Sequence, residues 1–449
     1  MIAGSLLALT ADIPDAVCIQ DVNFSGITTD TRNIKPGQLF VAIRGEQFDG
    51  HQFLQQAIDH GAAAVVAEVL PEGWNAPALK VTDTKVALGM IARFWRRKFM
   101  LPVIGVTGSN GKTTVKEMIA SVLASHFGQN KRLATSGNLN NEIGVPLTVM
   151  QLNSSHESAV IEMGMNHPGE IEQLAIAAQP TIGLVNNAQR EHQEFMHTVE
   201  AVARENGAVI NSLPSSGVAV FPADDIFTSI WREFAGQRKV ISFGFSQDAD
   251  VTADYKADQS GNTIHLTAFG ESVSFKLNAS GVHNVRNAMA AAACCLAAGL
   301  TLKQIADGLT SFSPVKGRLQ VHLSESHVTV IDDTYNANPD SVRAAIDVLR
   351  VYPDSLLILG DMGEVGEKGD EFHLEIGQYA REAGIRQVFL LGNLVKHTAD
   401  GFGSNARFFS SLDELNEALD TTVRSGMTVL VKGSRFMKME RVVQYLLKA

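Results

Sequence analysis

The feature that most limits how this chain can fold is a glycine-rich loop at residues 105–114, GVTGSNGKTT. An apolar, β-branched run at residues 101–106 precedes the loop and predicts a buried strand. After the loop, apolar residues recur at helical spacing from Val115 to Leu123, which predicts a helix with one face in the core. A strand, a glycine loop and a helix in this order surround an anion with backbone N–H groups. The segment therefore predicts a site for the phosphates of ATP.

Two side chains of the loop suit this chemistry. Lys112 can reach the β- and γ-phosphates, and the hydroxyl of Thr113 can ligate Mg²⁺. The strict phosphate-loop pattern requires glycine at position 106, where this chain has Val106, so the loop is a variant flanked by Gly105 and Gly108. The alternative is a glycine-rich surface turn before an ordinary helix.

Composition favours a large enzyme over a nucleic-acid or membrane protein. The chain has 449 residues, more than one hydrophobic core usually serves, and 45% of them are hydrophobic. No run approaches the roughly 20 apolar residues of a membrane span, and the N-terminus lacks a basic segment, so we expect no membrane insertion and a cytoplasmic protein. A net charge of −11 argues against a nucleic-acid partner. Cys294 and Cys295 are expected to be buried thiols.

The pattern of strands and helices divides the chain into three regions and predicts an α/β protein. Residues 1–84 alternate short strands with a helix and predict a small α/β domain. Residues 85–313 hold the glycine loop and further buried strands, and predict a phosphate-loop domain with a mainly parallel sheet. Residues 314–449 repeat buried strands separated by helical periods, as in a Rossmann-like domain with its own parallel sheet.

Polar segments follow several of the predicted strands, where open α/β sheets bind ligands. Glu162 ends one strand and suits Mg²⁺, although it could instead cap the helix after Pro168. Residues 186–192 (NNAQREH) follow the next strand, and their His192 could also be an ordinary surface histidine. Residues 332–339 (DDTYNANP) repeat the pattern in the last region, and 136–146 (SGNLNNEIGVP) place three asparagines between glycines, as suits a sugar or peptide.

Together these strings resemble the Mur ligase family, which forms amide bonds with ATP in peptidoglycan synthesis. The resemblance spans nearly the whole chain. It rests on the TGSNGKTT loop, the EMG at Glu162, the segment that ends at His192, GVHNVRN at 281–287 and PVKGR at 314–318. Residues 25–53 resemble the family's uridine-nucleotide domain.

Within the family, four strings are similar to the member that adds D-alanyl-D-alanine to a UDP-MurNAc-tripeptide: GNLNNEIGVP, DDTYNANPDS, LGDMGEVGE and VLVKGSRFMKME. The DNPR signature of the diamino-acid-adding member is absent from the sequence. The resemblance implies small-molecule substrates, ATP and Mg²⁺, and we expect a monomer. Two other possibilities are a related ligase, such as folylpolyglutamate synthase or the diamino-acid-adding enzyme, and a non-catalytic nucleotide-binding regulator.

The resemblance also implies roles for individual residues. Lys112, Glu162, His192 and Arg318 would be catalytic, and Thr113, Glu162 and His192 would hold Mg²⁺. The residues expected to bind the nucleotide are Gly108, Ser109, Asn110, Gly111, Lys112, Thr113, Thr114, His283, Asn284, Asn287, Arg318, Asp333, Tyr335 and Asn336. The residues expected to bind the other substrates are Thr29, Asp30, Thr31, Arg32, Gly50, His51, Asn138, Asn140, Asn141, Lys432, Ser434 and Arg435.

One position departs from the family pattern. Many members carry a carbamylated lysine that ligates a second Mg²⁺, in a segment similar to VAKAKGEI. Aligning residues 202–210 (VARENGAVI) with it places Asn206 at the lysine position, and asparagine cannot be carbamylated. Either a neighbouring carboxylate, Glu205 or Glu191, substitutes for the lysine, or His192, substrate and water hold the ion.

Overall fold

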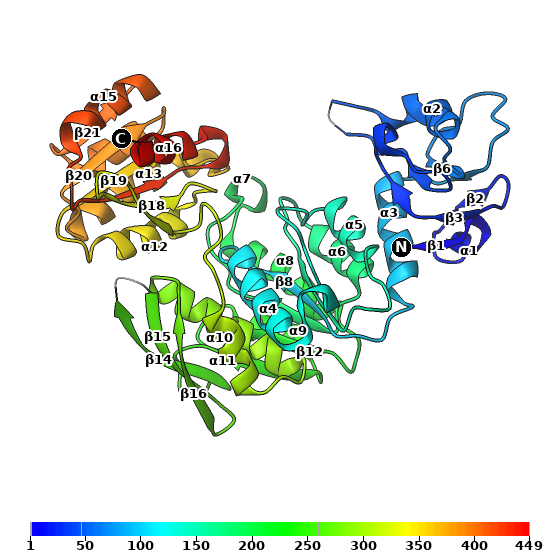
Figure 1. Ribbon diagram of the computed structural model, residues 1–449, viewed down its shortest axis with the longest axis horizontal. Coiled ribbons are helices and arrows are strands. Elements are labelled where there is room, and N and C mark those ends of the chain that lie inside the picture. Colours follow the sequence, from blue (N-terminus) through cyan, green and yellow to red (C-terminus); the bar gives the residue numbers. More distant parts are fainter. Residues whose placement is uncertain (1, 46, 259–260, 449) are drawn as a thin grey trace.

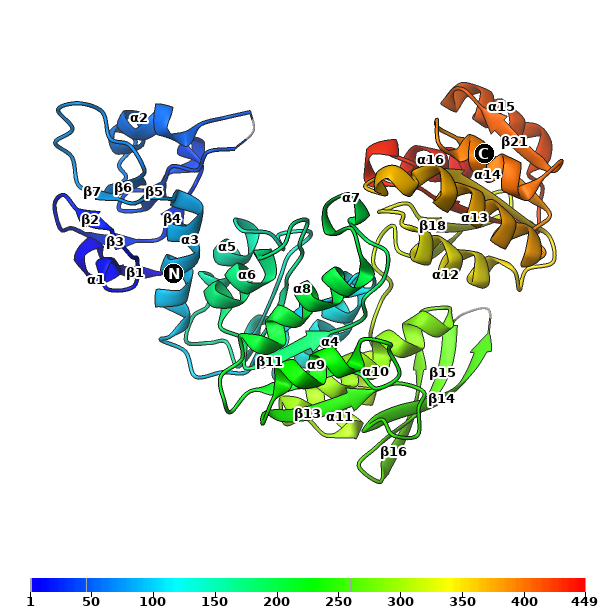
Figure 2. The same cartoon turned by 180° about the vertical axis from the view of Figure 1, so that it is seen from behind.

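The computed structural model describes residues 2–45, 47–258 and 261–448. The N-terminal region lies at one side of a central region, and the C-terminal region lies above the opposite side of it (Figures 1 and 2). Each region contains a mainly parallel sheet with helices, so the predicted α/β fold class is confirmed. The exact domain limits stay a prediction, because α3 (Thr84–Arg96) packs against helices of the central region.

The N-terminal region is built on a sheet with the strand order β2-β7-β6-β5-β4, in which only β2 is antiparallel to its neighbour. Strands β1 and β3 form a separate ribbon. The short strands and the helix predicted for residues 1–84 are present in this region. The elements are β1 (Ala3–Ser5), α1 (Leu6–Thr10), β2 (Val17–Cys18), β3 (Asn23–Ser25), β4 (Ile27–Thr28), η1 (Thr31–Asn33), β5 (Leu39–Val41), η2 (Gly50–Phe53), α2 (Leu54–Asp59), β6 (Ala64–Ala67) and β7 (Ala78–Lys80).

The central region has the strand order β16-β15-β14-β13-β12-β11-β8-β10-β9, parallel from β9 to β14 and antiparallel beyond. Its strands are β8 (Val103–Thr107), β9 (Arg132–Ala134), β10 (Ser158–Glu162), β11 (Ile182–Val185), β12 (Val218–Pro222), β13 (Lys239–Phe243), β14 (Val251–Asp258), β15 (Gly261–Ala268) and β16 (Glu271–Leu277). Its helices are α4 (Lys112–Phe127), η3 (Gln129–Lys131), α5 (Gly144–Val149), α6 (Glu170–Ala178), α7 (Gln193–Met196), α8 (Val199–Asn211), α9 (Thr228–Ala235), α10 (Val282–Ala297) and α11 (Leu302–Thr310).

Helices cover both faces of this central sheet, because successive strand residues point to opposite sides. Val103 packs into a core with α6, α8 and α9, whereas Ile104 packs into a second core with α4, α10 and α11. The predicted apolar stripe of α4 is fully buried there. Cys294 and Cys295 are buried free thiols of α10, as expected.

The C-terminal region has the strand order β17-β18-β22-β19-β20-β21, in which only β17 is antiparallel. No helix among the described residues is long and apolar enough to cross a membrane. The elements of this region are β17 (Gln320–Leu323), β18 (Thr329–Asp333), α12 (Pro339–Leu349), β19 (Ser355–Gly360), η4 (Gly366–Lys368), α13 (Gly369–Glu382), β20 (Gln387–Leu391), α14 (Val395–Phe402), β21 (Ala406–Phe409), α15 (Leu412–Thr422), β22 (Thr428–Lys432), η5 (Arg435–Met437) and α16 (Glu440–Lys448).

The contact between α4 and α11 requires glycine at position 308. A Cβ atom on Gly308 would lie 2.3 Å from Cα of Val122, so α11 could not keep its distance from α4. We expect Gly308→Ala to lower the free energy of unfolding by about 1–3 kcal/mol, although alanine alone favours a helix by about 1 kcal/mol. In α3, a Cβ on Gly89 would meet only Cβ of Ala177 at 3.7 Å. Gly89→Ala is therefore the matched control and should raise the calorimetric unfolding temperature, and a Gly308→Ala protein as stable as wild type would contradict the packing argument.

Candidate active site

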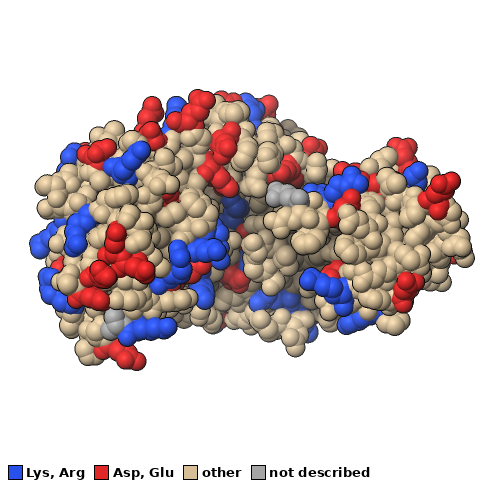
Figure 3. Space-filling view, turned by 90° about the horizontal axis from the view of Figure 1, so that it is seen from above, with Lys and Arg blue, Asp and Glu red and all other residues tan. Residues whose placement is uncertain are grey.

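The site forms where three neighbouring parallel strands end. In the central sheet β8 lies between β10 and β11, with Val106 opposite both Glu162 and Leu184. The loop after β8, the carboxylate at the end of β10 and the polar segment after β11 therefore meet at one edge. They line a cavity of about 1050 Å³ to which α10 and the C-terminal region also contribute. Seen from above, the surface is hollowed between the two ends of the molecule, with basic side chains in and along the hollow (Figure 3).

The glycine loop is held in place by side-chain amides. Asn206 accepts a hydrogen bond from N–H of Gly108 at 2.9 Å, and Asn187 accepts one from N–H of Asn110 at 2.9 Å. Gly111 precedes α4 with a φ of 81°, and a Cβ on it would lie 2.5 Å from Oδ1 of Asn287. The first turn of α4 leaves N–H groups without partners inside the helix, and the glycine loop turns them toward the cavity.

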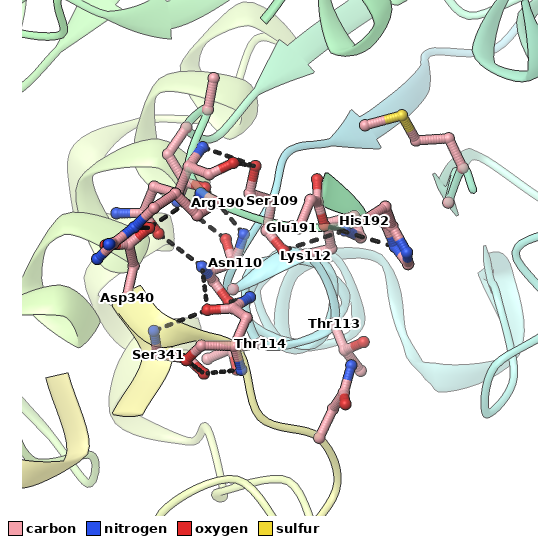
Figure 4. A pocket seen from close by; sticks show the side chains of 18 of the residues that line it. Ser109, Asn110, Lys112, Thr113, Thr114, Arg190, Glu191, His192, Asp340 and Ser341 are labelled. Atoms are coloured by element: carbon pink, nitrogen blue, oxygen red, sulfur yellow. Dashed lines mark hydrogen bonds and ion pairs between the residues drawn. The ribbon is translucent and has the colours of Figure 1, made fainter. Parts of the chain in front are cut away.

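Lys112 points back toward its own loop. Its ammonium group donates to the carbonyl oxygens of Gly108 and Ser109, the latter at 3.2 Å, and forms an ion pair with Glu191 at 3.2 Å (Figure 4). Its side chain is largely buried, at 15% exposure. The lysine predicted to bind phosphate is thus present in the site, but its donors are occupied by the protein.

Glu162 and Thr113 form a set of hard oxygen ligands. Oγ1 of Thr113 donates to Oε1 of Glu162 at 3.0 Å, and the amide of Asn140 donates to the same oxygen at 2.8 Å. Arg318, from the C-terminal side of the cavity, donates to Oγ1 of Thr113 at 2.9 Å. The other carboxylate oxygen, Oε2 of Glu162, is buried and has no hydrogen-bond partner among the described residues.

That unpartnered carboxylate oxygen fits a magnesium ion. Mg²⁺ prefers oxygen ligands and binds through one or two carboxylates with water and phosphate completing its shell. Within the described residues, no cluster of three or more His, Cys, Asp or Glu side chains could hold a metal ion by itself. The alternative role of Glu162, capping the following helix, is wrong, because Glu205 accepts the N–H groups of Gly169 and Ile171 at 2.8 Å each.

His192 adopts a left-handed backbone conformation, with a φ of 46°, and contacts the C-terminal region. Its Nδ1 lies 2.7 Å from Oε2 of Glu364, and this contact holds the pKa of the Glu364 carboxyl below its usual value. Its Nε2 lies 3.9 Å from Oε2 of Glu191. His192 is therefore a largely buried histidine of the cavity wall and not an ordinary surface histidine.

The C-terminal region supplies a buried ion pair and a stacked arginine. Lys432 pairs with Asp333 at 2.6 Å and donates to the carbonyl oxygen of Asn336 at 2.9 Å. Burial raises the pKa of the Asp333 carboxyl against the opposing charge of Lys432. The guanidinium of Arg318 stacks on the ring of Tyr335 at 4.1 Å from its centre.

Helix α10 completes the cavity with three predicted residues. Asn287 accepts a hydrogen bond from Asn186 at 3.0 Å and donates one to Asn284 at 3.1 Å. His283 touches the cavity, but protein surrounds the ring on most sides. Burial, followed by the nearby charge of Lys432, lowers the pKa of His283 to about 4, so the ring is neutral at physiological pH.

Comparison with known proteins shows to which family the chain is related. Sequence models of three Mur ligase domains match the chain: the Mur ligase family catalytic domain at residues 23–96, the middle domain at 106–295 and the glutamate ligase domain at 317–435. The UDP-N-acetylmuramoyl-tripeptide–D-alanyl-D-alanine ligase of Escherichia coli is 38% identical, and the match covers 99% of each chain. The chain belongs to the Mur ligase family.

Solved structures of Mur ligases have the same fold. A crystal structure of MurF from Acinetobacter baumannii has a TM-score of 0.90 at 32% identity and covers 98% of this chain and 97% of its own. MurF from Thermotoga maritima in complex with ADP has a TM-score of 0.85 at 28% identity, covering 94% and 96%.

Several predicted substrate residues of this Mur ligase lie away from the cavity. Neither the six predicted residues of the N-terminal region nor Asn138 lines it. Arg32, with an 83% exposed side chain, pairs with Asp30, and His51 accepts the N–H of Glu68 at 3.0 Å. At the other end of the chain, Ser434 accepts the N–H of Gly363 at 2.6 Å and does not line the cavity either. Arg435 is 65% exposed and pairs with Glu440.

The nearer predicted residues do reach the cavity. Asn140 contacts Glu162, whereas Asn141 lines the cavity and also accepts the N–H of Gly144 at 2.9 Å, which supports the start of α5. All the predicted nucleotide-binding residues except Gly108 line the cavity. Their roles in binding stay predictions.

The sequence did not reveal a bridge between the central and C-terminal regions of this Mur ligase. Arg190 forms an ion pair with Asp340 at 2.7 Å (Figure 4). It also pairs with Glu375 at 2.6 Å, and Asn110 exchanges amide hydrogen bonds with Asn338. Burial tends to lower the pKa of Arg190, but its hydrogen bonds to both carboxylates outweigh burial and raise it. Arg190 lies in the polar segment after β11, but nothing in the sequence identifies its partners on α12 and α13.

We expect Arg190→Ala to loosen the contact between the two regions. Charged hydrogen bonds of this kind contribute about 1.5–3 kcal/mol each. The variant leaves Asp340 without its cation and Glu375 paired with Arg343 alone. Small-angle X-ray scattering of the ligand-free protein should give a larger radius of gyration. The matched control is Arg435→Ala, since the pair of Arg435 lies within the C-terminal region. An unchanged radius in Arg190→Ala would show that the bridge does not hold the regions together.

Low pH should also loosen the contact between the central and C-terminal regions in the wild-type protein. The hydrogen bond from Arg190 lowers the pKa of Glu375 from its usual 4.5, so the pairing stabilises the arrangement above pH 4.5 and is lost as the pH falls through the lowered pKa. The wild-type radius should therefore rise below about pH 4.5, and the Arg190→Ala radius should change less over the same interval.

Proposed function

We propose that this protein is an ATP-dependent, ADP-forming ligase that joins D-alanyl-D-alanine to UDP-N-acetylmuramoyl-tripeptide, completing the UDP-MurNAc-pentapeptide precursor of peptidoglycan. The observation that carries the proposal is the meeting of Lys112, Thr113, Glu162 and Arg318 at one end of the cavity, in a chain similar over its full length to ligases of that name. We also propose that the reaction takes place in the cytoplasm.

The reaction joins a carboxylate to an amine in two steps. The carboxylate of the tripeptide attacks the γ-phosphorus of ATP, so that a C–O–P link forms, the bond to the β-phosphate oxygen breaks and ADP leaves. The amine of the dipeptide then attacks the activated carbonyl carbon, and phosphate leaves as the C–N bond forms and the amine loses its proton.

The first step brings two anions together, and the cations of the chain counter their repulsion. Lys112 at the start of α4 and Arg318, which contacts Thr113 in the same helical turn, can both face phosphate oxygens, as can the free N–H groups of the first turn of α4. Glu162 and Thr113 would hold Mg²⁺ through their oxygens, and His192 lies on the same side of the cavity. Bound there, Mg²⁺ would neutralise phosphate charge.

The C-terminal region would keep water away from the acyl phosphate. Lys432, Asp333 and Tyr335 lie on the wall opposite the glycine loop, and the bridge from Arg190 holds that wall close. Water exclusion matters because an acyl phosphate hydrolyses if water reaches it before the amine does. The turn near Ser313 and Pro314 joins the two regions, and we propose it as the hinge for closure.

The test of this function is ADP release by the purified protein with ATP and UDP-MurNAc-tripeptide, with and without D-alanyl-D-alanine. We expect sustained ADP release only when the dipeptide is present. Lys112→Ala should lower the rate at least about 100-fold, because it removes a cation aimed at the developing phosphate charge. Lys131→Ala, at an exposed pair with Glu157, should leave the rate unchanged. Release that does not depend on the dipeptide would eliminate this function.

The asparagine at position 206 leads to a second prediction. Asn206 is buried, and its side chain holds N–H of Gly108 instead of carrying a charge. We expect ligase activity to be the same in buffer freed of carbon dioxide and in buffer with added bicarbonate, because asparagine forms no carbamate. Recovery of activity on adding bicarbonate to a carbon-dioxide-free preparation would contradict this prediction.

A further inference from the structure

Glu191 is a buried carboxylate of the cavity to which the proposed reaction assigns no role. Its side chain is 6% exposed and comes from the segment after β11. Its Oε2 faces the ammonium group of Lys112 at 3.2 Å (Figure 4). Its Oε1 accepts a long hydrogen bond from the amide of Asn206 at 3.5 Å. Glu191 therefore lies directly behind the lysine of the glycine loop.

In this structure Lys112 has no donor left for a phosphate. An ammonium group has three N–H donors, and those of Lys112 face the carbonyl oxygens of Gly108 and Ser109 and the carboxylate of Glu191. To reach a nucleotide phosphate, the lysine has to give up at least one of these partners. The carboxylate is the only charged partner of the three.

Departure of the lysine would leave the carboxylate of Glu191 buried, with the neutral amide of Asn206 at 3.5 Å and the ring of His192 at 3.9 Å as its remaining partners. A buried carboxylate without a cation is strongly destabilised. Asn206 cannot supply the charge, because its oxygen is bound to N–H of Gly108 and its amide is neutral. Asp333 and Lys432 on the opposite wall already pair with each other. A second cation is therefore needed beside Glu191 when Lys112 turns away.

We propose that Glu191 exchanges cations during nucleotide binding: it holds Lys112 against the loop in the free protein and takes a divalent cation that arrives with ATP when Lys112 turns to the phosphates. The proposed exchange of cations rests on one part of the proposed function, namely that the cavity binds ATP. Nε2 of His192, 3.9 Å from Oε2 of Glu191, stands beside the place where that cation would lie.

The other carboxylate close in sequence, Glu205, does not fit this role. Both of its oxygens accept N–H groups at the start of α6, from Gly169 and Ile171, and it does not line the cavity. Glu191 and Glu205 are both glutamates near Asn206: Glu191 contacts its side chain, and Glu205 precedes it in the sequence. Of these two, Glu191 is the one that faces Lys112. Glu205 provides the matched control.

The experiment compares Glu191→Gln and Glu205→Gln with the full-length wild-type protein. The affinity for ATP is measured by titration calorimetry in EDTA and again with Mn²⁺, and bound Mn²⁺ is counted by electron paramagnetic resonance at saturating ATP. In EDTA, Glu191→Gln should bind ATP about tenfold more tightly than wild type, because the variant frees Lys112 and removes a negative charge next to the triphosphate. The gain in ATP affinity on adding Mn²⁺ should fall about tenfold or more in the same variant, and it should bind fewer Mn²⁺ ions. Glu205→Gln should match wild type in all three measurements.

The proposal requires both changes in Glu191→Gln. A variant with wild-type affinities would overturn it, and so would one that binds metal-free ATP more tightly yet keeps the full Mn²⁺ gain, because Glu191 would then be only a counter-ion of the lysine. If Glu191→Gln does not fold, Glu191→Asp keeps the charge but withdraws it by one methylene, and a wild-type Mn²⁺ gain in that variant overturns the proposal. None of these measurements involves the tripeptide or the dipeptide, so failure of the proposed ligase reaction would leave their outcome unaffected.

Discussion

The register of three parallel strands is the constraint on which the rest of the site depends. Because β8 pairs with β10 on one side and β11 on the other, Val106 lies level with Glu162 and Leu184. A shift of one residue would turn each strand's side chains to the opposite face and separate the carboxylate from the loop. The helices that cover both faces of the sheet fix this register, since Val103 and Ile104 each belong to a different core. The chemistry at the sheet edge therefore rests on apolar packing below it.

Much of this arrangement could be predicted from the sequence, because local patterns encode it. The apolar run before the loop and the helical stripe after it correspond to β8 and α4, and polar segments after buried strands do gather at one sheet edge. Contacts between distant segments could not be predicted in this way. Glu205 caps α6 across 36 positions, and Arg190 reaches Glu375 across 185. Arg435 follows a strand whose Lys432 faces the cavity, yet a short helical turn directs Arg435 toward Glu440.

Residues 186–192 (NNAQREH) connect the glycine loop to the C-terminal region. Asn186 and Asn187 contact the loop, whereas Arg190 and His192 contact side chains of the C-terminal region. His192 has a positive φ, as does its partner Glu364, a backbone conformation that costs free energy in residues other than glycine. The contacts on both sides hold this conformation. A displacement of the glycine loop would therefore move the same segment that supports the C-terminal wall.

Lysines of the cavity are paired with carboxylates before any ligand is present. Lys112 pairs with Glu191, and Lys432 with Asp333, while Arg318 contacts the hydroxyl that Glu162 also holds. Arg318 has no carboxylate partner among the described residues, but Lys112 and Lys432 must each leave a carboxylate before they can bind a triphosphate. Separating a lysine from its carboxylate costs less free energy if another cation takes the place of the lysine. The affinity of the cavity for a nucleotide therefore depends on whether a divalent cation binds with it. The pairing of Lys112 with Glu191 thus favours the nucleotide with its divalent cation over the nucleotide alone, and the neutral side chain of Asn206 leaves Glu191 as the carboxylate next to the loop lysine.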